Sequence, residues 1–108
     1  MDTLLDARPA PTRLQMESAN RMGQRLALAD AHQKASELFS AMDDMLRALK
    51  AMEACGAAKA FLWDTAAGTR DQTSKAMAAI NRNLDEQGAY PLDPLDLSDL
   101  DAFLAKVA

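Results

Sequence analysis

The chain has 108 residues, the length of one domain, and its apolar fraction of 49% with a net charge of −4 excludes an intrinsically disordered chain. It holds one Ile and one Val, which excludes a sheet built on β-branched residues and favours an all-α fold. The single cysteine excludes an intramolecular disulfide, and no run approaches the roughly 18 apolar residues of a membrane span.

The N-terminal region predicts a loose arm followed by a helix. Residues 1–11 are rich in proline near their end, and their two acids argue against a secretory signal. Thr12 and Gln15 have the spacing of a capping box, so a helix should begin at Arg13. Its first part carries an apolar stripe that is offset from the later pattern, which predicts a kink or a change of buried face near residues 23–32. The stripe consists of Met16, Ala19, Met22, Leu26 and Ala29.

An apolar ladder dominates the middle of the chain. Its members alternate at steps of three and four residues, as in a heptad seam, and must be buried within the monomer or across a homo-oligomer. We expect a two-fold dimer, because the return helix has only a thin apolar stripe with which to cover the ladder. The ladder consists of Leu28, Ala31, Ala35, Leu38, Met42, Met45, Leu49 and Met52.

A glycine after the ladder predicts a helical hairpin. Gly56 is a plausible helix end, so the turn should fall between about residues 54 and 58. Residues 57–67 and 70–87 then form either two helices separated at Gly68 or one long return helix, and Thr69 with Gln72 offers a second capping box. The core domain is expected to span 12–88, as a hairpin or small bundle.

Residues 89–108 form an acidic segment rich in Pro and Leu that ends in a short helix. From residue 85 onward the chain holds six acids and one base, a net of −5. Ser98 should cap the final helix. Its apolar side chains either dock on this chain's own bundle or enter the groove of a partner, and the sequence leaves both open. The candidate partner-binding residues are Leu97, Leu100, Phe103 and Leu104.

The sequence predicts no catalytic, cofactor-binding or metal-binding residues. His32 is the only histidine, too few for a zinc or haem site. Cys55 is expected to be a small packing residue, although an exposed reactive thiol is the alternative. The aspartates of the C-terminal segment are expected to be solvated, and no phosphate- or dinucleotide-binding glycine pattern is present.

These observations favour a non-enzymatic helical protein that binds and regulates or inhibits a larger protein, for example a phage-encoded inhibitor or a secretion adaptor. The first alternative is a small structural subunit of a phage particle or secretion apparatus. The second is a nucleic-acid-linked regulator, which the overall acidity disfavours. The expected partners are a protein of unknown identity and a second copy of the chain, with no membrane. The expected location is the cytoplasm, or the host cytoplasm for a phage product.

Overall fold

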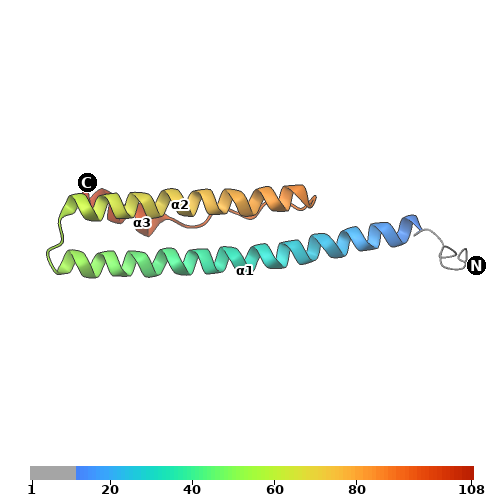
Figure 1. Ribbon diagram of the computed structural model, residues 1–108, viewed down its shortest axis with the longest axis horizontal. Coiled ribbons are helices and arrows are strands. Elements are labelled where there is room, and N and C mark those ends of the chain that lie inside the picture. Colours follow the sequence, from blue (N-terminus) through green and yellow to red (C-terminus); the bar gives the residue numbers. More distant parts are fainter. Residues whose placement is uncertain (1–11) are drawn as a thin grey trace, which may run out of the picture.

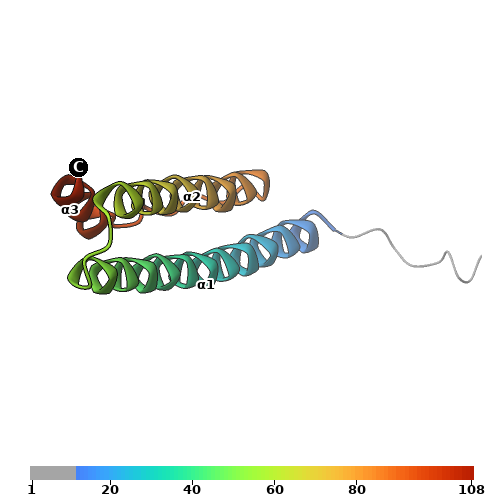
Figure 2. The ribbon, with the colours of Figure 1, turned by 60° about the vertical axis from the view of Figure 1, so that its left-hand side comes forward.

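A computed structural model describes residues 12–108, and within them the fold is all-α, as predicted. Helix α1 spans Arg13–Ala54, α2 spans Lys59–Glu86 and α3 spans Ser98–Val107. The first two helices form a long antiparallel hairpin (Figure 1), and the chain then runs back along the hairpin so that α3 lies near its turn (Figure 2). The arm expected over residues 1–11 lies outside the described residues.

Helix α1 begins at the predicted capping box. The backbone N–H of Thr12 donates to Oε1 of Gln15 at 2.8 Å, and the backbone N–H of Gln15 donates to Oγ1 of Thr12 at 3.1 Å. The helix then continues without a break for 42 residues, about 63 Å at 1.5 Å per residue. Near residues 23–32, where a kink or a change of buried face was expected, the helix continues unbroken through Gly23, which a helix tolerates at a cost of about 1 kcal/mol, and the first buried residue of α1 is Ala31.

The hairpin turns where the sequence predicted. Gly56 has a φ of 86°, a left-handed conformation that favours glycine. The N–H of Ala57 donates to the carbonyl of Met52, and that of Gly56 donates to Glu53, both at 3.0 Å. This pair of bonds is a Schellman motif, and it ends α1 by satisfying two of its last carbonyls.

Helix α2 is the single long return helix. It passes through Gly68, and the hydroxyl of Thr69 donates to the carbonyl of Thr65 instead of starting a new helix. Thr73 is the one buried polar residue among those described, and its hydroxyl donates to the carbonyl of Thr69 at 2.7 Å. That bond lets the hydroxyl lie in the helix interface without losing a partner.

The core sits at the turn end of the hairpin, where all three helices meet. Two ion pairs hold α3 there. Arg70 of α2 pairs with Asp101, and Lys106 of α3 pairs with Glu53 of α1 at 2.7 Å. The core consists of Met42, Leu46, Leu49, Leu62, Ala66, Leu100, Phe103 and Val107. Because α3 supplies three of these eight side chains, the core depends on α3 as well as on the hairpin.

The start of α3 differs from the expected cap. Ser98 is the first residue of the helix instead of the residue before it. The carboxylate of Asp96 accepts bonds from the backbone N–H of Ser98 at 3.0 Å and from its hydroxyl at 2.6 Å. These two bonds lower the pKa of Asp96 below its ordinary value, because they favour the charged carboxylate.

Candidate interaction surfaces

The structure divides the predicted ladder into two sets. Ala31, Ala35, Met42 and Leu49 are buried, whereas Leu28, Met45 and Met52 are exposed and Leu38 is partly buried. Leu46, which the ladder omitted, is only 2% exposed. A narrow heptad seam describes contact with one helix, but near the turn α1 meets both α2 and α3, and this shifts its buried face toward Leu46 and leaves Met45 and Met52 exposed.

The C-terminal segment docks on this chain's own hairpin. Leu100 and Phe103 are buried in the core, and Leu97 and Leu104 pack against it partly buried. Leu100 and Phe103 are therefore unavailable to a partner while α3 is docked, whereas Leu97 and Leu104 keep part of their surface exposed. The alternating Leu and Asp pattern suits docking on this chain's own hairpin and docking on a partner equally well, so the sequence could not distinguish the two.

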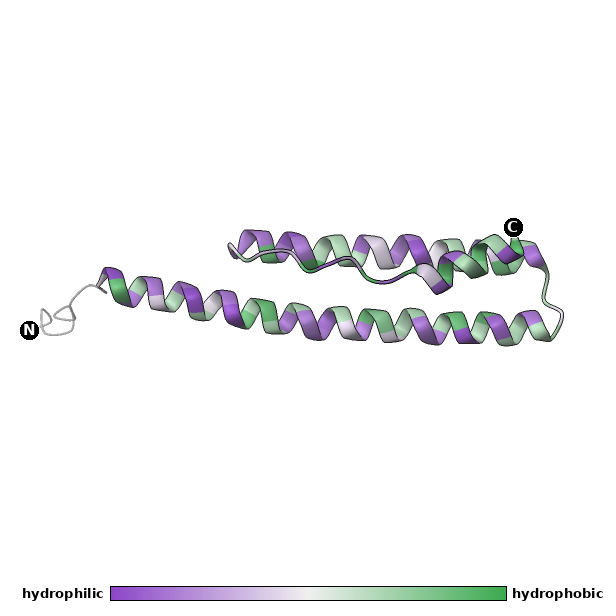
Figure 3. Ribbon diagram, turned by 180° about the vertical axis from the view of Figure 1, so that it is seen from behind, coloured by the Kyte–Doolittle hydropathy of each residue, from purple (hydrophilic) through white to green (hydrophobic). Residues whose placement is uncertain are grey.

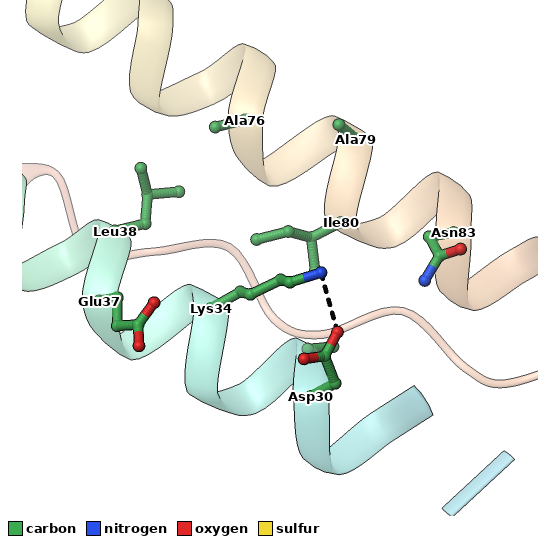
Figure 4. A pocket seen from close by; sticks show the side chains of 9 residues that line it. Asp30, Lys34, Glu37, Leu38, Ala76, Ala79, Ile80 and Asn83 are labelled. Carbon is green, nitrogen blue, oxygen red and sulfur yellow. Dashed lines mark ion pairs between the residues drawn. The ribbon is translucent and has the colours of Figure 1, made fainter. Parts of the chain in front are cut away.

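An open groove runs along the hairpin between α1 and α2. It combines two hollows of about 640 and 300 Å³, which share Leu38 and Ala76 and so form one channel. Figure 4 shows the wider hollow, in which Leu38 and Ile80 reach toward each other between the two helices. Besides these residues, α1 contributes Asp30, Ala31, Lys34, Glu37, Ala41, Met42 and Met45, and α2 contributes Thr69, Gln72, Thr73, Ala79 and Asn83.

Residues 89–108 cover a different side of the hairpin. They lie behind the hairpin in Figure 1 and in front of it in Figure 3. The extended part runs along the hairpin, where Leu92 and Leu95 share one hollow with His32, Phe39 and Met77. None of the residues in the C-terminal segment lines the open groove. The hairpin therefore has one side covered in cis and one side without a covering element among the described residues.

Charged side chains border the open groove on the α1 side. Nζ of Lys34 lies 2.9 Å from Oδ2 of Asp30, as the dashed line in Figure 4 marks. The hydrogen bond to Asp30, with its charge, raises the pKa of Lys34 above the ordinary value. Glu37 accepts a bond from the side chain of Gln33 at 3.3 Å. An ion pair this exposed contributes little to the stability of the fold. Asp30, Lys34 and Glu37 together give the groove a charged rim on the α1 side.

The first part of α1 projects beyond the rest of the molecule (Figure 1). At the level where α2 ends, Nε2 of Gln24 donates a bond of 3.3 Å to the carbonyl of Gly88, and the part of α1 before Gln24 extends past this point. Every member of the offset stripe is exposed, and Met16, Met22 and Leu26 are exposed by 56%, 63% and 67%. The sequence detected this stripe, and no element within residues 12–108 covers it.

The remaining sequence candidates stand apart from these surfaces. Cys55 is exposed at the hairpin turn, not packed as expected. His32 is exposed beside the hollow under the C-terminal segment. Among the described residues, no group of three or more His, Cys, Asp or Glu side chains is placed to hold a metal ion. Within residues 12–108, no helix combines the length and apolar character needed to cross a membrane.

Comparison with protein-family models, curated proteins and solved structures finds no match to this chain.

Proposed function

We propose that this chain is a non-enzymatic interaction protein that binds a larger protein through the projecting part of α1 and thereby regulates or inhibits it. The observation that carries the proposal is an exposed apolar stripe, with Met16, Ala19 and Met22 on the part of α1 that extends past α2 and Leu26 and Ala29 beside the end of α2. Apolar side chains at helical spacing are the pattern by which one helix enters a groove of another protein.

The flanking charges indicate the chemistry of the partner. Arg21 and Arg25 are exposed on the same segment, beside the stripe. A helix with an apolar stripe and a basic border fits an apolar groove that has acidic residues at its rim. Flexible methionine side chains suit such a contact, because they adapt to an irregular surface. The expected partner is therefore a protein with an acidic, hydrophobic groove.

The test compares capture of partners by the chain and by stripe variants. Met22→Asp and Leu26→Asp place a charge in the stripe at exposed positions, so the circular dichroism melt should be unchanged while capture of a partner is lost. Asn20→Asp adds the same charge on the same segment away from the stripe, and it should bind as the original chain does. A captured protein would then be purified and its affinity for all four chains measured.

Two results would contradict the proposal. One is a purified partner that binds Leu26→Asp and the original chain equally well. The other is growth of the isolated chain into open-ended assemblies in light scattering, which would favour the structural-subunit alternative.

A further inference from the structure

The methionines of the described residues differ widely in exposure. Met42 and Met77 are buried, at 3% and 7% exposed. Met16 and Met22, on the first part of α1, are 56% and 63% exposed, more than any other methionine within residues 12–108. A thioether sulfur is oxidised only where an oxidant reaches it, so the exposed and the buried pair should differ in reactivity.

Met16 and Met22 also supply most of the apolar surface that the stripe offers beyond the end of α2. Before Gln24, the stripe consists of these two methionines and Ala19. Ala19 has a single methyl group, so a partner that covers this part of the stripe contacts mainly the two thioethers. No described residue in this part of α1 is buried, so a chemical change there leaves the packing of the bundle intact.

We propose that Met16 and Met22 form a reversible oxidation site at which a peroxide switches off binding through the stripe, and this proposal rests on the function proposed above for the stripe. The O–O bond of the peroxide breaks, one oxygen atom bonds to the thioether sulfur, and the other leaves as water or an alcohol. The sulfur loses two electrons, which the peroxide takes up. A dithiol reductase reverses the step, because its two thiols form a disulfide and the oxygen leaves as water.

Oxidation should weaken binding of the partner without unfolding the chain. A sulfoxide carries a polar oxygen, which loses its water in an apolar groove and gains no hydrogen-bond donor there. Oxidation of both methionines should therefore raise the dissociation constant of the partner about tenfold or more. Leu26 and the two alanines of the stripe do not react in this way, so the effect should come from Met16 and Met22 alone.

Two chains isolate the effect of these two methionines. Both carry Met45→Leu and Met52→Leu, because Met45 and Met52 are 41% and 43% exposed and would also react. The second chain carries Met16→Leu and Met22→Leu in addition. Leucine keeps the stripe apolar at nearly the same volume but has no sulfur to oxidise. The two chains therefore differ only in whether the stripe can be oxidised.

Peptide mapping by mass spectrometry tests the reactivity without a partner. In dilute hydrogen peroxide, Met16 and Met22 of the first chain should oxidise about tenfold or more faster than Met42 and Met77, because a buried methionine reacts only after local opening. Once Met16 and Met22 are oxidised, the circular dichroism melt should be unchanged, and methionine sulfoxide reductases with a dithiol should restore the original mass. Equal rates for the two pairs, or loss of the cooperative melt, would overturn the proposal.

Retention on a phenyl column measures the apolar surface of the stripe, again without a partner. After treatment with peroxide, the first chain should elute earlier than before, because two apolar side chains of the stripe have become polar. The second chain should elute as before. An equal shift of the two chains would mean that oxidation acts elsewhere, and the proposal would fail.

The purified partner separates the oxidation site from the proposed function. The oxidised first chain should bind it about tenfold or more weakly, and the oxidised second chain should bind it as tightly as before treatment. A partner that is lost on Leu26→Asp but binds the oxidised first chain unchanged would refute the oxidation site and leave the proposed function standing. A partner that binds Leu26→Asp and the original chain equally would refute the proposed function and, with it, the control of binding by oxidation.

Discussion

Replacing Leu100 with alanine should remove a large share of the stability of this fold. Leu100 has no exposed surface and contacts the core formed with the hairpin. A buried Leu→Ala change costs about 2–5 kcal/mol, out of a total of about 5–15 kcal/mol for a typical domain. At about 4–8 °C per kcal/mol for a domain of this size, the melting temperature should fall by about 10 °C or more.

Urea unfolding followed by two probes measures this effect. Circular dichroism reports helix content, and Trp63 reports the docking of α3, because it lines a hollow with Val107 and Ala108. Leu14→Ala is the matched control, since Leu14 is 74% exposed and its loss should leave the urea midpoint unchanged. All chains are compared at one protein concentration, because dimerisation would shift the midpoint. An unchanged midpoint for Leu100→Ala would refute the assignment of α3 to the core.

Two further predictions concern a pair of glycines and one carboxylate. Gly56→Ala should destabilise the chain by about 1–2 kcal/mol, because Gly56 has a left-handed backbone conformation. Gly68→Ala should stabilise it by about 0.5–1 kcal/mol, because Gly68 is a helical residue with open space around it. Thermal melts of the two variants compare these effects. The contact between Asp96 and Ser98 should be fully formed above pH 3.8, the ordinary pKa of Asp96, and lost as the pH falls through the lower pKa of the folded state. An NMR titration of the Ser98 amide should show that transition in the original chain and lack it in Asp96→Asn, and a midpoint at or above 3.8 would contradict the expectation.

Local signals in the sequence were sufficient to predict the start of α1 and the turn of the hairpin. The capping box at Thr12 and the helix end at Gly56 depend on hydrogen bonds to residues at most five positions away, so the rest of the fold does not alter them. The signals at Gly68 and Thr69 also had helix-boundary form, but packing of α2 along α1 carried the helix through them. Tertiary contacts override local preference where a long apolar face is to be buried.

The sequence predicted which stretch of α1 is buried, but not the line along the helix on which the burial is centred. The sequence identifies an apolar side from Leu28 to Met52, and the structure buries four of its eight members, which are Ala31, Ala35, Met42 and Leu49. It does not reveal that α3 returns to the turn and moves the centre of burial from Met45 to Leu46. For the same reason, the sequence could not predict that the open groove and the early stripe are exposed, because their exposure depends on which other elements pack against them.

The part of α1 before Gln24 also lacks tertiary support, since none of its described residues is buried. An isolated helix of that length is marginal in water, because its first turn is costly to nucleate. Here the packed part of α1 supplies the nucleus, and the projecting turns only need to propagate from it. Their helix–coil balance is therefore governed by intrinsic propensity, with Gly23 as its weakest point. The number of helical turns available to a partner is therefore determined by this helix–coil equilibrium, and not by contacts within the bundle.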